Sequence, residues 1–123
     1  MYWWNQQEEP IQFNFRNIVG CALGFGTNLP KGYYAQLVPR SGNAIKFGLI
    51  VVNTPATIDT EYTGEWIAII GNIGNKPKKL KLDDKICQMI LRKMEEFESV
   101  EVQKADLTST DRGAKGFGSS DKK

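Results

Sequence analysis

The chain has 123 residues, of which 41% are hydrophobic and 24% are charged, and this size and composition predict one globular domain. Its net charge of +2 predicts no strongly basic face, so we expect no stable nucleic-acid binding. Histidine is absent, which excludes Ser-His and Cys-His nucleophile pairs and every His-ligated metal site. Cys21 and Cys87 lie far apart in apolar stretches, and this favours buried, reduced thiols over a disulfide or a zinc site.

No apolar run approaches the roughly 20 residues that a membrane-spanning helix requires. Nothing in the chain resembles a signal peptide. We therefore expect a cytoplasmic protein without a membrane partner.

Short runs rich in Ile, Val, Phe and Tyr alternate with Gly, Pro, Asn and Asp along the chain, and this pattern predicts an all-β domain. The strands are expected at residues 11–15, 33–38, 47–52, 66–70 and 85–91. Turns are expected at residues 30–32, 39–43, 53–55 and 72–77. Only residues 92–100 have a helix-forming composition. Many short strands at this spacing indicate a sandwich, a jelly roll or a small barrel.

The C-terminal residues differ from the rest, because they are rich in Gly, Ser and Lys and contain almost nothing to bury except Phe117. A disordered terminus is one interpretation. A lone aromatic among glycines, serines and cations also suits an arm that closes over an anionic aromatic ligand. We divide the chain into a domain at residues 1–108 and a flexible arm at residues 109–123.

The first segment whose residues are suited to ligand binding is Pro39-Arg40-Ser41-Gly42. An Arg fork, a hydroxyl and an accessible Gly backbone N–H form a suitable phosphate cradle. Taken alone, the same four residues are also an ordinary surface turn.

Two further segments contain polar residues that need an explanation. Asp59 and Tyr62 lie near the bend of an expected hairpin, where they could also be a turn residue and a packing residue. Gln88 interrupts an apolar strand, and its amide must therefore bind a neighbouring backbone or a ligand shell.

Together these segments resemble, in order and spacing, motifs of the homotrimeric dUTPase family. The second family motif is matched by Pro-Arg-Ser-Gly at 39–42, and the third by Ala-Thr-Ile-Asp-Thr-Glu-Tyr-Thr-Gly at 56–64. The fourth is matched by Asp-Asp-Lys-Ile-Cys-Gln at 83–88, and the fifth by Arg-Gly-Ala-Lys-Gly-Phe-Gly-Ser-Ser at 112–120. Asn53 follows Ser41 by twelve residues and precedes Asp59 by six, as in the family pattern.

The resemblance implies a distorted jelly-roll β-barrel that forms a homotrimer, with each active site assembled from three chains. It implies Mg²⁺-dependent hydrolysis of dUTP to dUMP and pyrophosphate, which keeps uracil out of DNA and supplies dUMP for dTMP synthesis. Asp59 is the implied catalytic carboxylate, which deprotonates the attacking water. Asn53, Thr57 and Ile58 would bind the uracil edge, and Tyr62 would stack on the deoxyribose and exclude a 2′-hydroxyl.

The implied phosphate-binding residues come from two other chains. Arg40, Ser41 and Gly42 of a second chain would hold the triphosphate, with Gln88 binding water nearby. Residues from the arm of a third chain complete the implied substrate site. Phe117 would cover the uracil, Arg112, Ser119 and Ser120 would hold the γ-phosphate, and Gly118 is a further implied substrate-binding residue. Mg²⁺ would be bound mainly through the substrate phosphates, so no direct protein ligand is assigned.

The chain also departs from the family pattern. Ala56 and Asp83 stand where glycines are usual, and Lys115 replaces the first Gly of a Gly-Gly-Phe sequence. Ala56 would strain the hairpin if its position required a positive φ. The first family motif, Ala-Gly-x-Asp-[Leu/Phe], is expected near residues 1–5 and is not found there.

Two other functions remain open from the sequence. A dUTPase-like nucleotide-binding or regulatory trimer with impaired turnover is favoured by the missing first motif. A dCTP deaminase is disfavoured by the Pro-Arg-Ser-Gly segment and by the Gly-Phe-Gly-Ser-Ser arm.

Overall fold

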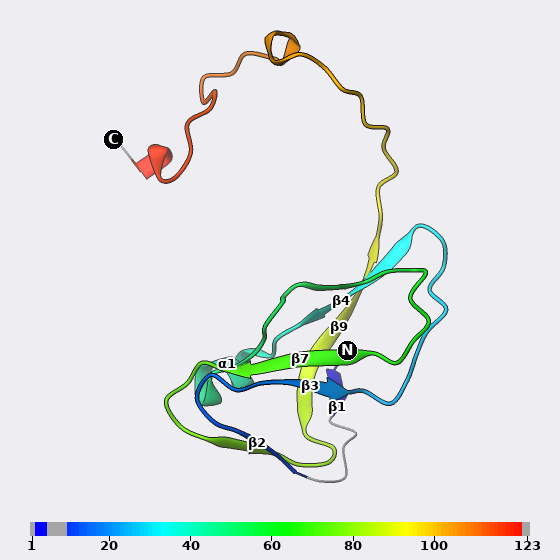
Figure 1. Ribbon diagram of the computed structural model, residues 1–123, viewed down its shortest axis with the longest axis vertical. Helices are drawn as coiled ribbons and strands as arrows, with labels where there is room; N and C mark the ends of the chain where they lie inside the picture. Colours follow the sequence, from blue (N-terminus) through cyan, green and yellow to red (C-terminus); the bar gives the residue numbers. More distant parts are fainter. Residues whose placement is uncertain (1, 5–9, 122–123) are drawn as a thin grey trace.

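The computed structural model describes residues 2–4 and 10–121, with side chains described from residue 10 onward. The described residues contain nine strands, one α-helix and two short 3₁₀ helices, which confirms the prediction of an all-β domain (Figure 1). The strands are β1 (Tyr2–Trp4), β2 (Ile11–Phe13), β3 (Ile18–Ala22), β4 (Tyr33–Val38), β5 (Leu49–Val51), β6 (Ala56–Ile58), β7 (Ile67–Asn72), β8 (Lys78–Leu80) and β9 (Lys85–Lys93). The helices are α1 (Ser41–Phe47), η1 (Lys104–Asp106) and η2 (Ser119–Asp121).

The strands form three antiparallel sheets, ordered β1-β9-β4-β6, β3-β7-β5 and β2-β8. Each sheet contributes apolar side chains to one continuous core. The fully buried side chains include Phe13, Cys21, Leu23, Leu37, Val51, Trp66, Ile70 and Cys87. Sheets that enclose a shared core, with their edges left unjoined, are consistent with the predicted jelly-roll class.

The outer face of the β3-β7-β5 sheet is apolar as well. Along β7, Ala68 and Ile70 are buried, whereas Ile67 and Ile69 point outward and are 49% and 37% exposed. The β3–β7 register pairs Ile18 with Gly71, so the exposed Ile18 side chain lies on the same outward face as Ile69. The residues of this outward face are Ile18, Gly20, Ala22, Ile50, Val52, Ile67, Ile69 and Gly71. A sheet with apolar residues on both faces is typical of a strand layer that is covered on both sides.

Helix α1 occupies a segment where the sequence predicted a turn followed by a strand. Ser, Gly and Asn at its beginning are poor helix formers, which hid it from the sequence pattern. Gly48 ends the helix with φ 67°, and its N–H donates to the carbonyls of Asn43 and Ala44. Because this left-handed residue interrupts the chain, the predicted strand at 47–52 begins only at Leu49.

Residues 92–100, which have a helix-forming composition, contain no helix. Arg92 and Lys93 complete β9, and residues 94–103 have no regular structure. A segment this short cannot maintain a helix without packing. Figure 1 shows the chain leaving the sheets after β9, extending away from them and then curving back in an arc to its C-terminus, which stays apart from the sheets. The predicted boundary between domain and arm at residue 108 stays a prediction.

At the N-terminus, β1 pairs with β9, and Trp3 lies opposite Cys87. The first family motif was expected near residues 1–5, of which residues 1 and 5 lie outside the described part of the chain. Within the described residues, no helix is long and apolar enough to cross a bilayer.

Candidate active site

A cavity of about 310 Å³ lies beside the hairpin that follows β6. Thr57, Ile58, Asp59, Tyr62 and Ile67 line it, and four of these five were predicted site residues. Strand β6 brings Thr57 and Ile58 to the cavity because it pairs with β4, where Thr57 lies opposite Gln36. The structure therefore brings the predicted carboxylate and the predicted aromatic ring to one hollow.

Hydrogen bonds fix the turn between Asp59 and Tyr62. The Tyr62 N–H donates to the Asp59 carbonyl at 3.1 Å, and the Thr60 hydroxyl donates to the Leu29 carbonyl at 3.0 Å. The Tyr62 hydroxyl donates to the Glu65 carbonyl at 2.7 Å, which orients the ring. An exposed carboxylate beside a fixed aromatic ring can hold a water and a sugar at the same place.

The structure also shows where two other residues singled out in the sequence, Ala56 and Asn53, lie near this hairpin. Ala56 lies in β6 opposite Leu37 and is not among the residues with positive φ, so the alanine causes no backbone strain. Asn53 lies on the exposed turn between β5 and β6, and it does not line the hairpin cavity. The structure therefore does not bring Asn53 together with Asp59.

A second group of predicted residues surrounds the beginning of α1. Arg40 precedes the helix in an extended conformation, and Ser41 and Gly42 are its first residues. An added Cβ on Gly42 would meet no atom within 4 Å, so the backbone there is open to a ligand. The Arg40 guanidinium donates to the Lys85 carbonyl at 3.3 Å, and the Asn43 amide donates to the same oxygen at 2.9 Å. These bonds attach the phosphate-cradle segment to β9.

Gln88 belongs to this second group. Its side-chain amide donates to the Pro39 carbonyl at 2.9 Å, directly before the Arg40-Ser41-Gly42 sequence. The half-buried glutamine is thus satisfied by a backbone acceptor, which is one of the two alternatives that its position predicted.

The turn that precedes Gln88 accounts for another departure from the family pattern. Asp83 adopts φ 67°, a left-handed conformation that glycine adopts most easily and aspartate tolerates better than most residues. Asp84 closes the same turn, because its carboxylate accepts the Lys81 N–H at 2.8 Å.

A third group lies in the arm. Arg112, Ser119 and Ser120, together with Asp111 and Lys115, line a hollow of about 270 Å³. The Arg112 Nε donates to the Lys115 carbonyl at 2.8 Å. In the same segment Phe117 is fully exposed with φ 50°, and Gly118 follows it with φ 85°. The exposed ring has no place in the core of its own chain.

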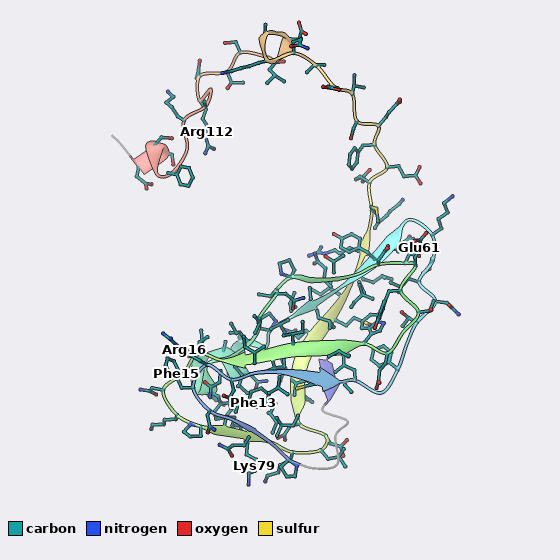
Figure 2. All side chains as sticks on the ribbon, in the orientation of Figure 1. Phe13, Phe15, Arg16, Glu61, Lys79 and Arg112 are labelled. Atoms are coloured by element: carbon teal, nitrogen blue, oxygen red, sulfur yellow. The ribbon has the colours of Figure 1, made fainter. Side chains whose placement is uncertain are left out.

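The three groups do not meet within one chain. Figures 1 and 2 show α1 at one end of the sheets and Glu61, in the Asp59–Tyr62 turn, at the other end. Arg112, which Figure 2 labels, lies on the extended C-terminal segment away from both. A single chain therefore presents three separate parts of the predicted site.

The described residues contain no group of three or more His, Cys, Asp or Glu side chains that could hold a metal ion. Burial raises the pKa of Cys21 from its ordinary 9.0 to about 11. Burial, and then the neighbouring Cys21, raise the pKa of Cys87 to about 12. Both thiols are fully buried and unpaired by a disulfide, so the prediction of two buried free thiols is confirmed.

Two residues with a role at these groups were missed in the sequence. Asn43 shares the Lys85 carbonyl with Arg40, and Glu65 accepts the Gly24 N–H at 3.0 Å beside the hairpin. Their proximity to the Pro-Arg-Ser-Gly and Tyr-x-Gly motifs was the only available signal. Neither contact follows from the local sequence, because the partners are 42 and 41 residues away.

Comparison with known proteins identifies the family of the chain. Residues 9–121 match the family model described as dUTPase. The deoxyuridine 5′-triphosphate nucleotidohydrolase of Orientia tsutsugamushi strain Ikeda is 48% identical over 99 residues, or 79% of this chain. The enzyme of the same name from Fusobacterium nucleatum is 43% identical over 95 residues, or 77% of this chain. The matched region is 64% of the length of each relative.

Solved structures show the same fold. The dUTPase of Staphylococcus bacteriophage 80alpha, solved with dUPNHPP, has a TM-score of 0.79 and 18% identity, and the match covers 96% of this chain and 84% of the phage chain. The native EIAV dUTPase has a TM-score of 0.70 and 22% identity, with 83% and 82% covered. The jelly-roll prediction is thereby confirmed. The extent of the family match and the identity to these relatives show that the chain belongs to the dUTPase family.

Proposed function

We propose that this chain hydrolyses dUTP to dUMP and pyrophosphate. The observation that carries the proposal is the placement of Asp59 and Tyr62 around one cavity in a member of the dUTPase family. Relatives that carry the name deoxyuridine 5′-triphosphate nucleotidohydrolase support the same activity.

Asp59 is proposed as the general base. Its exposed carboxylate deprotonates a water that attacks the α-phosphorus, and the α–β phosphoanhydride bond breaks to release pyrophosphate. The absence of histidine from the chain leaves a carboxylate as the natural group for this proton transfer.

The hairpin is proposed to select the nucleoside. The backbone of Thr57 and Ile58, which line the cavity, hydrogen-bonds the uracil edge, and cytosine would leave one of these polar groups unpaired. Asn53 lies outside this cavity in its own chain, on the turn before β6, so its contact with the uracil stays a prediction. Tyr62, held by its bond to the Glu65 carbonyl, packs against the deoxyribose and leaves no room for a 2′-hydroxyl.

The segment before α1 is proposed to bind the phosphates. Arg40, Ser41 and Gly42 contribute charge, a hydroxyl and open backbone. Gln88 holds this segment through Pro39 and binds water near the phosphates. We propose that Mg²⁺ is held mainly by the substrate phosphates, with no direct protein ligand assigned. The ion would neutralise charge on the triphosphate.

We propose that the working assembly is a homotrimer, because the base, the phosphate segment and the arm lie apart in one chain. The apolar outward face of the β3-β7-β5 sheet supports association of subunits, since an exposed face of this kind is costly in water. The face reaches the hairpin cavity through Ile67, which belongs to both.

The arm is proposed to close over the site of a neighbouring subunit. Phe117 covers the uracil, while Arg112, Gly118, Ser119 and Ser120 approach the γ-phosphate. A stretch of 15 residues can reach about 50 Å when extended at roughly 3.3 Å per residue. Closure would exclude water and strengthen the charge interactions at the phosphates.

A pyrophosphate-release assay with the purified chain and Mg²⁺ tests the function. We expect release from dUTP, and much slower release from dCTP, dTTP and UTP at equal concentration. Equal rates with all four nucleotides would contradict the nucleoside selection, and no release from dUTP would contradict the hydrolase.

The second candidate is a nucleotide-binding or regulatory trimer with impaired turnover. It is favoured by residues 1–5, which do not match the first family motif and contain no aspartate. Calorimetric binding of dUMP without pyrophosphate release from dUTP would support this second function.

A further inference from the structure

A β-bulge lies where β3 runs past the beginning of β7. The Leu23 N–H donates to the Trp66 carbonyl at 2.9 Å, and the Trp66 N–H donates to the Phe25 carbonyl at 2.9 Å. Gly24, between them, has φ 79°, and its N–H is therefore left out of the strand pair. A glycine serves here because the left-handed backbone disfavours other residues.

The Glu65 side chain accepts a hydrogen bond from the Gly24 N–H, which the bulge leaves without a partner in the strand pair. Its Oε1 accepts the Gly24 N–H at 3.0 Å, which is a hydrogen bond to a carboxylate. The backbone carbonyl of the same residue accepts the Tyr62 hydroxyl at 2.7 Å. Glu65 thus contacts the bulge through its side chain and the cavity-lining tyrosine through its backbone.

The bulge segment and the hairpin are also packed closely. A Cβ added to Gly26 would come within 2.9 Å of the Thr63 and Gly64 carbonyl oxygens. A Cβ on Gly64 would come within 2.9 Å of the Tyr62 hydroxyl oxygen. The Tyr62 ring therefore lies over Gly64, and movement of residues 63–65 would displace the ring.

We propose that Glu65 is a positioning residue, whose carboxylate attaches the hairpin to the Gly24 bulge and thereby fixes Tyr62 at the edge of the cavity. This role rests on the proposed function, because it concerns the fit of the deoxyribose against Tyr62. Glu65 does not line the cavity, so it acts on the substrate through Tyr62 and not by direct contact.

The position requires a hydrogen-bond acceptor and not a negative charge. Glutamine retains a side-chain carbonyl oxygen at the same reach, whereas alanine removes the acceptor. Tyr62 contacts the sugar in both the bound substrate and the transition state, so its displacement should weaken binding more than it slows chemistry.

The test compares Glu65→Ala, Glu65→Gln and wild type in steady-state kinetics with dUTP. Glu65→Ala should raise KM by roughly 2- to 10-fold, the range that corresponds to one net hydrogen bond, with a smaller change in kcat. Glu65→Gln should restore KM to near the wild-type value. Glu61→Ala removes an exposed carboxylate of the same hairpin and should leave both constants unchanged.

Turnover of dUTP by the wild type tests the proposed function. The ratio of the KM of each variant to the KM of the wild type tests the role of Glu65. Amide hydrogen exchange measured by NMR provides a second readout that needs no substrate. The Gly24 amide should exchange faster in Glu65→Ala and at the native rate in Glu65→Gln. An unchanged KM and an unchanged Gly24 exchange rate in Glu65→Ala would overturn the inference, as would an equal loss of binding in both variants.

Discussion

Gln88 donates a hydrogen bond from its side-chain amide to the carbonyl oxygen of Pro39, at 2.9 Å. The bond joins β9 to the segment that immediately precedes Arg40, Ser41 and Gly42. The glutamine is half-buried, so its amide would be costly to leave without an acceptor. The structural role of Gln88 is therefore to hold the segment of Arg40, Ser41 and Gly42 in place.

Replacing Gln88 by alanine should loosen this segment. We expect the free energy of unfolding to fall by about 0.5–1.5 kcal/mol, the net contribution of one hydrogen bond, and KM for dUTP to rise. Urea denaturation and steady-state kinetics measure the two effects. The exposed Gln103 provides the matched control, and Gln103→Ala should change neither value. An unaltered KM in Gln88→Ala would show that the Pro39 contact does not serve the site.

The longest strands were predictable because their sequences are apolar runs bounded by turn residues. Strand β4 was predicted with its observed bounds, and β9 was predicted at 85–91 and extends to Lys93. Strands β6 and β8 have only three residues each, too few to reveal a period of two. Helix α1 depends on its left-handed Gly48 cap and on contacts made after folding, which local propensity does not contain.

The sequence indicated candidate residues for the site but not their arrangement in space. The spacing of Asp59 and Tyr62 identified the hairpin, and the structure places both at one cavity. The contact from Glu65 to Gly24 spans 41 residues and arises from a bulge, so no local pattern indicates it. The separation of α1, the hairpin and Arg112 is likewise a property of the tertiary fold.

Asp59→Asn should reduce kcat for dUTP by about 10²–10⁴-fold, the usual contribution of a positioned general base. The amide keeps the size of the side chain, and the turn keeps its bond from the Tyr62 N–H to the residue 59 carbonyl. Binding of dUMP, measured by calorimetry, should therefore change little. Near-normal turnover in this variant would exclude Asp59 as the base.

Deleting residues 112–123 should leave the fold intact. Each hydrogen bond described for residues 109–121 joins two residues of that same segment, so their loss removes no described bond to the sheets. Turnover should nevertheless fall on the order of 10²-fold, because phosphate donors and the uracil lid are lost. Thermal melting and pyrophosphate release measure the two outcomes.

The single variant Phe117→Ala tests the proposed uracil lid without removing the rest of the arm. It should lower kcat/KM for dUTP, whereas Phe97→Ala should not, although Phe97 is also a highly exposed phenylalanine on the C-terminal segment. Equal activity of the two variants would show that Phe117 has no part in closure.

Ile69→Asp should disrupt the proposed trimer. Ile69 lies on the apolar outward face, where a carboxylate would be buried against a neighbouring subunit without a partner. Light scattering should give about three times the chain mass of 13.8 kDa for the wild type and a smaller mass for the variant. Leu82→Asp changes an exposed leucine outside this face and should remain trimeric. A wild-type monomer that hydrolyses dUTP would contradict assembly of the site from several chains.

The two buried thiols predict a loss of stability at alkaline pH. In the folded chain the pKa of Cys21 is about 11 and that of Cys87 about 12, whereas both are near 9.0 when exposed by unfolding. The unfolded chain therefore releases these protons first, so the stabilisation is complete below pH 9 and is lost as the pH rises toward 11–12. At pH 8 the native thiols should not react with a disulfide reagent, and both should react once the chain is unfolded in guanidinium.

Denaturation of wild type and of the Cys21→Ala, Cys87→Ala double variant between pH 8 and 11 isolates this effect. The double variant should be less stable at pH 8, because two small cavities are opened in the core, but its stability should decline less steeply above pH 9. The two proteins differ only at the two cysteines, so the difference between their pH profiles isolates the thiols. Parallel pH profiles, or rapid thiol reaction in the native state, would show that the thiols are more accessible than their burial indicates.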